Sequence, residues 1–255
     1  MLSVKKGLKL LCGNITKNLC YVFHFFFPKK RFIIPPYAKA LKKAKYEQKI
    51  PRIIWQTNFT DKVTLPVYIN YLVNRWTCPT YEHHFVSTEA RAEFIKANYS
   101  KEIFDAYSRI QIGAAQADFW RVLVLQKYGG VYLDIDATIV CSLDKLIKPT
   151  DNEVFLNLKG DRICNSFIAA TPNNPNIEKV INQIMQNIKE NKEKGVFGMT
   201  GPGVFRKLFD VKKFSTFPYK SQFQGGFTNE YFQYIDKAEG KWTKQQFTTD
   251  IIRKD

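Results

Sequence analysis

Histidine is scarce in this 255-residue chain, which contains only His24, His83 and His84. None of them stands at metal-ligand spacing from a second histidine and a carboxylate, which argues against a histidine-based zinc hydrolase. The five cysteines include no C-x-x-C pair, so neither a structural zinc site nor a disulfide framework is expected. Their odd number and wide scatter indicate a reducing compartment.

Several nucleotide-binding and hydrolase signatures are missing as well. The sequence contains no G-x-S-x-G, no G-x-x-x-x-G-K-[ST] and no G-x-G-x-x-G. Their absence counts against a serine hydrolase, a P-loop NTPase and a classical dinucleotide enzyme. The chain is 45% hydrophobic and 15% aromatic, which is not the composition of a disordered chain. Its 255 residues are enough to bury the core of one large domain.

Acidic residues are rare in the first part of the chain, so the charge is unevenly distributed. The whole sequence carries a formal net charge of +16. Residues 1–50 contain twelve Lys or Arg residues and a single acid, Glu47. The basic character therefore belongs mainly to an N-terminal arm, residues 1–49, and the globular domain is expected to cover residues 50–255.

No apolar run is long enough to cross a bilayer, which takes about 20 residues as a helix. The longest run, residues 19–27, is followed by no cleavage site, so a secretory signal peptide is not expected. A basic stretch with an aromatic cluster is typical of an anchor on the surface of an anionic membrane. Two alternatives remain open: a solvated arm with its Phe cluster against the body, and an arm that binds nucleic acid.

The body of the chain alternates between strand and helix patterns. Residues 50–56 form an apolar run that predicts a buried first strand. Residues 112–128 have helical composition and end at Gly129-Gly130, which supplies the stop. The other expected elements are a strand at 81–87, a helix with Thr88 as its N-cap, strands at 131–136, 154–158 and 166–170, and helices at 37–48 and 177–193. This alternation predicts an α/β layered domain.

Asp134-Ile135-Asp136 is the sharpest feature of the sequence. In an extended chain the two carboxylates lie on the same side, and Ile135 points into the core. Two acids at the end of an apolar strand are costly unless a cation or water offsets their repulsion. One or two carboxylates and a polyphosphate commonly hold Mg²⁺ or Mn²⁺. The pattern therefore suggests a metal site, and the alternative is a turn with two solvated acids.

Asp118 and Arg121 add to this interpretation. They lie three residues apart in an apolar helical segment and therefore share a face. A buried Asp and Arg at this spacing form either a structural ion pair or a polar cluster that faces a pocket. Because the Gly129-Gly130 turn brings this helix back beside the Asp134-Ile135-Asp136 strand, we interpret the four charged groups as a pocket.

Two further candidates carry weaker signals. Trp55 ends the first strand, at the edge where α/β domains bind ligands, although a tryptophan of the core is equally consistent. Thr200-Gly201-Pro202-Gly203 is either a backbone loop that approaches a phosphate or sugar, or a simple turn.

These residues resemble a known family, the glycosyltransferases that contain the DXD motif, and within them glycosyltransferase family 32. The resemblance rests on Ala115-x-x-Asp118-x-x-Arg121 followed by Tyr128-Gly129-Gly130-Val131-Tyr132-Leu133-Asp134-Ile135-Asp136. Residues 50–56, 165–170 and 200–203 are similar to other blocks of the family. Its members include relatives of the yeast initiating mannosyltransferase, bacterial capsule and lipopolysaccharide sugar transferases and, more distantly, the large clostridial toxins.

The resemblance implies a GT-A fold, which is a Rossmann-like nucleotide-sugar-binding domain with a mixed central sheet flanked by helices. It also implies a nucleotide-sugar donor, with UDP favoured, a Mn²⁺ or Mg²⁺ ion, and retention of the anomeric configuration. Asp136 would be the metal ligand, and Asp134 would contact the ribose, the sugar or the metal through water. Asp118 and Arg121 would hold sugar hydroxyls.

The remaining roles that the resemblance implies concern the nucleotide and the acceptor side. Trp55 and Gln56 would lie near the nucleotide base, Asn165 would line the sugar or acceptor side, and Gly201 would contact the nucleotide sugar. The family often completes its metal site with a C-terminal His and a Ser-Trp pair. Here no His follows His84, so the group that completes the site is open, with Lys241 or Lys244 as candidates to neutralise the diphosphate.

Three functions are consistent with the sequence. The first is a cytoplasmic hexosyltransferase that extends a glycan or lipid-linked saccharide, in capsule, lipopolysaccharide or related surface polysaccharide synthesis, on the cytoplasmic face of a membrane. The second is a transferase that modifies a protein. The third is a non-enzymatic basic module for anionic lipid or nucleic acid. Because the D-x-x-R and D-x-D patterns are intact, we favour the first, and no specific nucleic-acid partner is expected.

Overall fold

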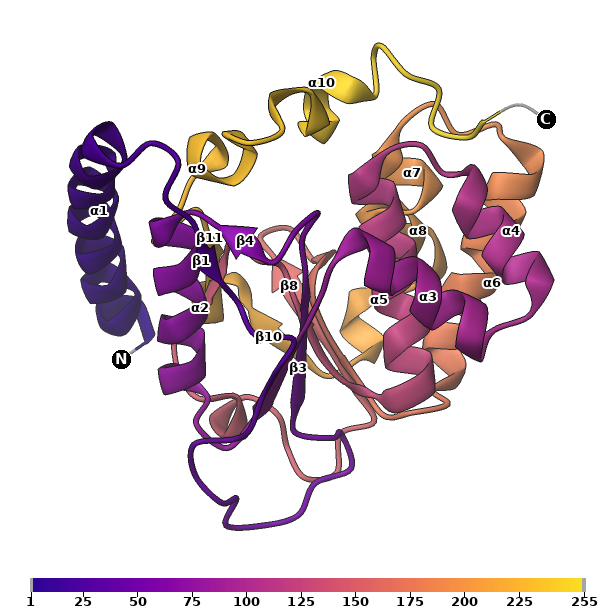
Figure 1. The fold of residues 1–255 in the computed structure, drawn as a ribbon. Helices are drawn as coiled ribbons and strands as arrows, with labels where there is room; N and C mark the ends of the chain where they lie inside the picture. Colours follow the sequence, from indigo (N-terminus) through magenta and orange to yellow (C-terminus); the bar gives the residue numbers. More distant parts are fainter. Residues whose placement is uncertain (1, 254–255) are drawn as a thin grey trace.

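A seven-stranded mixed sheet forms the centre of the computed structural model, which describes residues 2–253. Helices cover both sides of this sheet (Figure 1). The arrangement confirms the expected α/β architecture with a mixed central sheet flanked by helices.

The elements follow one another along the whole described chain. The strands are β1 (Phe32–Ile33), β2 (Tyr37–Ala38), β3 (Ile53–Thr57), β4 (Lys62–Val63), β5 (Glu82–Val86), β6 (Gly130–Leu133), β7 (Ala137–Ile139), β8 (Glu153–Leu158), β9 (Arg162–Ala170), β10 (Thr216–Pro218) and β11 (Gln222–Gln224). The α-helices are α1 (Leu2–Phe26), α2 (Leu65–Thr77), α3 (Thr88–Asn98), α4 (Lys101–Arg109), α5 (Gly113–Tyr128), α6 (Pro175–Glu190), α7 (Val196–Met199), α8 (Pro202–Leu208), α9 (Glu230–Tyr234) and α10 (Trp242–Gln245). Short 3-10 turns are η1 (Leu143–Lys145), η2 (Val211–Lys213), η3 (Tyr219–Ser221) and η4 (Ala238–Gly240).

The strand order places β3 and β6 side by side in the sheet. The order is β10-β8-β9-β6-β3-β5-β2. Strand β3 runs parallel to both neighbours, whereas β9 is antiparallel to β6 and to β8. Because Trp55 on β3 is paired with Tyr132 on β6, the residues that follow these two strands meet at one edge. In open α/β sheets, ligands bind beyond the carboxyl ends of the strands.

Two glycines join α5 to β6 and thereby set the position of the residues after β6. Gly129 and Gly130 have φ angles of +65° and +100°, which glycine adopts at little cost. A Cβ on Gly130 would lie 2.8 Å from the carbonyl oxygen of Ile53. The second glycine therefore allows β6 to approach β3 closely. Helix α5 ends at Tyr128, where the sequence predicted its end.

Most of the predicted elements are present, and four expectations need correction. The predicted helix at residues 37–48 is wrong: β2 pairs with β5, and residues 39–50 form bends and irregular chain. This lysine-rich stretch has no apolar face that a helix could bury.

The N-cap of α3 is Ser87, whose side chain accepts from the N–H of Ala90, and not Thr88. Helix α6 ends at Glu190, where Asn191 takes the left-handed conformation, and β6 ends at Leu133 rather than at residue 136.

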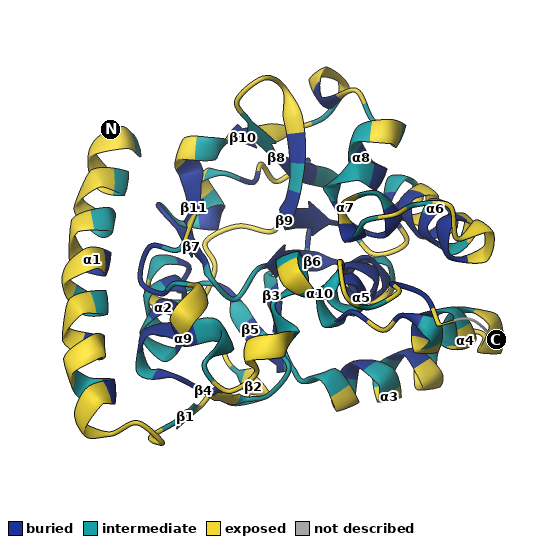
Figure 2. Cartoon of the chain, turned by 90° about the horizontal axis from the view of Figure 1, so that it is seen from above, coloured by how far each residue is buried: buried dark blue, intermediate teal, exposed yellow. Residues whose placement is uncertain are grey.

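The N-terminal residues pack against the body. Helix α1 lies beside α2 (Figures 1 and 2), β1 pairs with β4, and β2 forms the edge of the main sheet. The expected boundary at residue 50 therefore does not coincide with a break in the structure. The residues before this boundary contribute strands β1 and β2, whereas a separate arm would contribute none.

Among residues 2–253, no helix combines the length and the apolar character that crossing a membrane requires.

His83 on β5 makes the stability of this fold sensitive to acid. It is buried against Tyr71 of α2, and its two ring nitrogens have no hydrogen-bond partner among the described residues. Burial, reinforced by the charges of Arg75 and His84, lowers the pKa of His83 to about 3. The unfolded chain therefore takes up the proton first as the pH falls. We expect this residue to lower the free energy of unfolding by about 1.4 kcal/mol per pH unit between about pH 6.5 and pH 3.

Urea unfolding of the protein and of His83→Leu at pH 7 and pH 5 measures this effect. The leucine variant should lose about 2 kcal/mol less than the parent on acidification. Equal losses in the two proteins would show that His83 does not carry the acid sensitivity.

Candidate active site

A cleft of about 570 Å³ opens where β3 and β6 end. Its walls come from α3, α5, the turn after β6, strand β9 and the C-terminal residues 224–245. Asp118, Arg121, Asp134, Asp136 and Asn165 all line it. Five of the eight site residues predicted from the sequence thus line one cleft, whose volume is typical of small-ligand sites.

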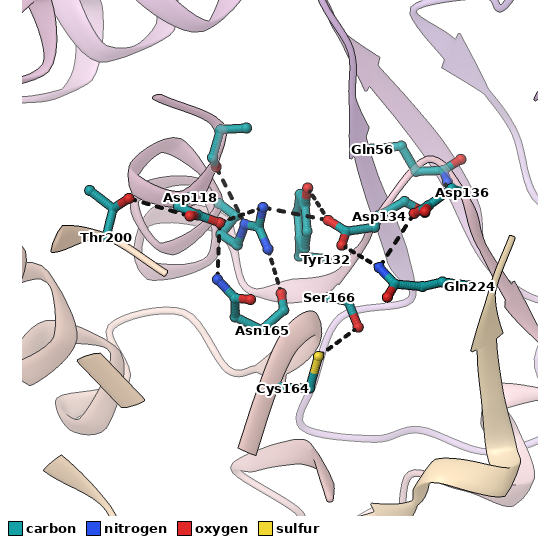
Figure 3. Close-up of polar contacts among 12 residues, drawn as sticks. Gln56, Asp118, Tyr132, Asp134, Asp136, Cys164, Asn165, Ser166, Thr200 and Gln224 are labelled. Atoms are coloured by element: carbon teal, nitrogen blue, oxygen red, sulfur yellow. Dashed lines mark hydrogen bonds and ion pairs between the residues drawn. The ribbon is translucent and has the colours of Figure 1, made fainter. Parts of the chain in front are cut away.

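Asp134 and Asp136 lie in a turn rather than on an extended strand. The N–H of Ala137 donates to the carbonyl oxygen of Asp134 at 3.0 Å. The carboxylates nevertheless converge, because Nε2 of Gln224 lies 3.1 Å from Asp134 Oδ2 and 3.5 Å from Asp136 Oδ1 (Figure 3). Gln224 reaches them from β11, where it is paired with Ala137 of β7. Ile135 lies half-buried between them and packs towards α2.

Asp118 is held by three side chains deep in the cleft. Nη2 of Arg121 lies 2.7 Å from Asp118 Oδ1. The same oxygen accepts from Nδ2 of Asn165 at 2.9 Å, and Oδ2 accepts from the hydroxyl of Thr200 at 3.3 Å. Both carboxylate oxygens are therefore engaged, and the side chain of Asp118 is fixed in one orientation (Figure 3).

The guanidinium of Arg121 links this network to Asp134. Its Nη1 donates to the carbonyl oxygen of Asn165 at 2.6 Å, and its Nη2 lies 3.4 Å from Asp134 Oδ1. The guanidinium also lies over the ring of Tyr132, 4.2 Å from the ring centre. The Tyr132 hydroxyl donates to Asp134 Oδ1 at 2.8 Å. One buried cation therefore positions the two carboxylates that flank it.

Two acids of the cleft, Asp118 and Asp136, have pKa values raised towards the protonated form. Burial raises the pKa of Asp118 to about 6, and the Arg121 charge opposes this rise only in part. Burial and the neighbouring Asp134 charge raise the pKa of Asp136 to about 6. Burial, followed by the charges of Asp136 and Asp134, raises the pKa of Tyr234 to about 12. The cleft thus has an excess of negative charge around Asp136 that a bound cation would relieve.

The Asp134 and Asp136 pair fits a divalent cation. Their oxygens converge at the cleft, and Mg²⁺ or Mn²⁺ takes one or two carboxylates together with the phosphates of a ligand. Within the described part of the chain, no group of three or more His, Cys, Asp or Glu residues is arranged to hold a metal ion. Asp134 and Asp136 would therefore supply the protein ligands, with ligand phosphates and water taking the other positions.

Three nominated residues do not line the cleft. Trp55 packs between His84 and Tyr128, with its indole N–H donating to the carbonyl oxygen of Gly129 at 2.9 Å. Gln56 is buried behind the turn, where its Nε2 lies 3.4 Å from the carbonyl oxygen of Asp134. Gly201 lies beside the wall, while its neighbour Pro202 forms part of it.

The C-terminal residues contribute side chains that sequence reasoning did not find. Gln224, Gln233, Tyr234, Lys237 and Trp242 all line the cleft. Gln233 hydrogen-bonds to Asp136. Lys241 and Lys244 were the candidates to neutralise a diphosphate. Lys241 pairs with Glu230, Lys244 is exposed, and neither lines the cleft. Most of the residues that sequence reasoning missed stand in very short elements, β11, α9 and α10, which leave no periodic pattern in the sequence, so only the polar and aromatic composition could have indicated them.

Comparison with known proteins gives one family. Residues 66–153 match the family model described as "Glycosyltransferase sugar-binding region containing DXD motif". This segment contains Asp118, Arg121, Asp134 and Asp136, which are four of the residues that line the cleft.

Curated relatives and solved structures agree with this match. The chain is 23% identical to the initiation-specific alpha-1,6-mannosyltransferase of Schizosaccharomyces pombe, over 63% of this chain and 48% of that protein. It is 26% identical to an uncharacterized glycosyltransferase of Acanthamoeba polyphaga mimivirus, over 49% of this chain and 50% of that protein. The chain thus spans about half the length of these curated relatives.

The fold is shared with a solved glycosyltransferase domain. The PaToxG glycosyltransferase superposes with a TM-score of 0.53 at 20% identity, over 63% of this chain and 69% of that one. The expected GT-A type of fold is therefore confirmed. Residues 66–153 thus resemble the sugar-binding region of the glycosyltransferases that contain the DXD motif.

Proposed function

We propose that the chain transfers a hexose-type sugar from a nucleotide-sugar donor to a growing glycan or a lipid-linked saccharide. The observation that carries this proposal is the convergence of Asp134 and Asp136 on one amide beside the buried network of Asp118 and Arg121. One half of this arrangement suits a diphosphate with its cation, and the other suits the hydroxyls of a sugar. The mannosyltransferases among the relatives support the reaction class.

Breaking the anomeric bond of a donor develops negative charge on the departing diphosphate and positive charge on the sugar. A divalent ion held by Asp136 and Asp134, Mn²⁺ or Mg²⁺, would supply Lewis acid stabilisation of the diphosphate. Asp118, fixed by its three partners, would orient the sugar as it becomes oxocarbenium-like. The C-terminal residues that line the cleft, among them Tyr234 and Trp242, would exclude water and so limit hydrolysis of the donor.

We infer retention of the anomeric configuration without a covalent intermediate. The described carboxylates that line the cleft are Asp118, Asp134, Asp136 and Glu230. Asp118 is engaged on both oxygens, and Glu230 is paired with Lys241. Asp134 and Asp136 would hold the cation, so none of the four acids is free to act as a nucleophile towards the sugar. A sugar adduct trapped on an Asp or Glu and located by mass spectrometry would overturn this inference.

The acceptor we favour belongs to capsule, lipopolysaccharide or related surface polysaccharide synthesis on the cytoplasmic face of a membrane. This choice rests on the basic N-terminal residues, which suit a surface of negative charge.

Titration of UDP and GDP into the purified protein, with and without Mn²⁺, tests the donor site. We expect one of the two nucleotides, UDP by the family resemblance, to bind at least about tenfold more tightly with the metal ion present. In Asp136→Ala this gain should disappear, because the variant lacks one of the two converging carboxylates.

The matched control is Asp105→Ala, which removes a carboxylate that is exposed on α4 and paired with Lys101. This variant should bind nucleotide as the parent does. If neither nucleotide binds the parent protein under any metal condition, the transferase proposal is wrong.

A further inference from the structure

Helix α1 is turned so that Lys9 and Lys17 face the protein, whereas most of its apolar side chains face outward. On the inner side, Nζ of Lys9 donates to the carbonyl oxygen of Ile139 at 2.7 Å, and Nζ of Lys17 donates to that of Gly225 at 2.9 Å. Gly13, Cys20 and His24 are the buried residues of this helix. A helix on the surface of a soluble protein normally shows the opposite pattern.

The outer side of α1 carries a continuous apolar stripe. Its members recur at intervals of three or four residues, so they stack along one face of the helix. Each of them is between 54% and 76% exposed. The outer stripe consists of Val4, Leu8, Leu11, Ile15, Leu19, Val22 and Phe26. Figure 2 shows α1 as the outermost helix of the molecule, with a largely exposed outer face.

Exposed lysines lie at both ends of the outer stripe. Lys5 is on the first turn of α1, and Lys29 and Lys30 follow its last turn. An apolar helix face flanked by basic residues is the pattern of helices that lie flat in the interface of an anionic bilayer. At about 1.5 Å per residue the helix is roughly 37 Å long, which gives a long line of contact parallel to the surface.

We propose that the outer stripe of α1 docks the protein on an anionic membrane surface, with the helix axis parallel to the bilayer. A second copy of the chain is a poorer occupant, because residues 2–31, which contain α1 and the turn after it, carry seven Lys or Arg residues and no acid, and two such segments would repel each other. An anionic surface is complementary to the same charge. The partner is chosen from the shape and charge of α1, independently of the proposed reaction.

The inner side of α1 connects this docking surface to the cleft. Nδ2 of Asn229 donates to the hydroxyl of Tyr21 at 2.7 Å, and Lys17 holds the carbonyl oxygen of Gly225. A Cβ on Gly13 would lie 2.4 Å from the carbonyl oxygen of Gly226, so the helix touches this segment closely. Gln224 and Gln233, which contact Asp136, belong to the same segment. Docking of α1 would therefore place the segment that contacts Asp136 directly behind the helix that lies on the membrane.

Cosedimentation with vesicles tests the docking surface. The full chain, without nucleotide, is mixed with vesicles of phosphatidylcholine and phosphatidylglycerol, or of phosphatidylcholine alone. We expect strong binding to the anionic vesicles, weakening as salt is added, and little binding to the neutral ones. Leu11→Gln/Ile15→Gln should lower the partition coefficient by about tenfold or more, because both side chains lose apolar contact with the bilayer.

The control variant is Phe247→Gln, which removes an apolar side chain that is 83% exposed away from α1. It should bind vesicles as the parent does, and circular dichroism should show that both variants keep their helices. Failure of the parent to bind anionic vesicles, or equal binding by Leu11→Gln/Ile15→Gln, would overturn the proposal. A dimer in light scattering that the double variant dissociates, without vesicle binding, would identify a second copy as the occupant instead. Nucleotide titration remains informative in every case, since it does not require a membrane.

Discussion

Replacing Arg121 by methionine is expected to lower the free energy of unfolding by about 3–5 kcal/mol, because it leaves buried carboxylates without their cation. Arg121 is 5% exposed, and its guanidinium contacts Asp118 at 2.7 Å and Asp134 at 3.4 Å. It also donates to the carbonyl oxygen of Asn165. The loss therefore combines an uncompensated charge on Asp118 with an unsatisfied carbonyl group. Urea unfolding at pH 7.5 measures the change.

The companion variants separate charge from geometry. Arg121→Lys keeps the charge but not the planar fork that reaches both acids and a carbonyl group, so an intermediate loss is expected. In the double variant Asp118→Asn/Arg121→Met the buried charge on residue 118 is absent, and the loss should be smaller than in Arg121→Met alone. Strictly additive effects of the two substitutions would show that Asp118 and Arg121 do not act as a pair.

Much of the site could be predicted from sequence because its residues are close together in the chain. Residues 113–136 form one helix–turn–strand unit, in which the glycines, the apolar pattern and the charged exceptions all indicate the same structure. A charge inside an apolar segment is costly, so Asp118 and Arg121 stood out. The predicted extended backbone of Asp134-Ile135-Asp136 was wrong. The two carboxylates nevertheless converge as predicted, because the turn and β11 bring both of them to Gln224.

The rest of the site depends on contacts between distant parts of the chain. Gln224 reaches the acids through the pairing of β11 with β7, and Gln233 through the short helix α9, and elements this short leave no periodic pattern in the sequence. Trp55 has the position of a ligand-binding residue but is held in the core by Tyr128 and Gly129. Helix α1 shows a related limit: its apolar residues were recognised as a cluster at 19–27, but only the fold shows that the stripe begins at Val4 and faces outward.

Replacing Asp136 by asparagine is expected to move activity and stability in opposite directions. The rate of sugar transfer should fall by at least about 100-fold, which corresponds to about 2.7 kcal/mol of transition-state stabilisation, because one carboxylate that would hold the cation is lost. In a metal-chelating buffer, by contrast, the variant should be more stable than the parent by about 1–2 kcal/mol at pH 7.5. The reason is that burial and the Asp134 charge disfavour the ionised Asp136 carboxylate in the folded protein.

The difference in stability between Asp136→Asn and the parent depends on pH. Because the pKa of Asp136 rises from 3.8 in the unfolded chain to about 6 in the folded one, its carboxylate destabilises the fold fully above about pH 6 and not at all below about pH 3.8. The stability advantage of Asp136→Asn should therefore shrink as the pH is lowered from 7.5 to 4, and unfolding followed at both values measures it. Addition of Mn²⁺ at pH 7.5 should stabilise the parent and leave the variant unchanged. A variant that keeps its transfer rate would exclude Asp136 as a metal ligand, whereas a variant less stable than the metal-free parent would show that the carboxylate is needed for the fold.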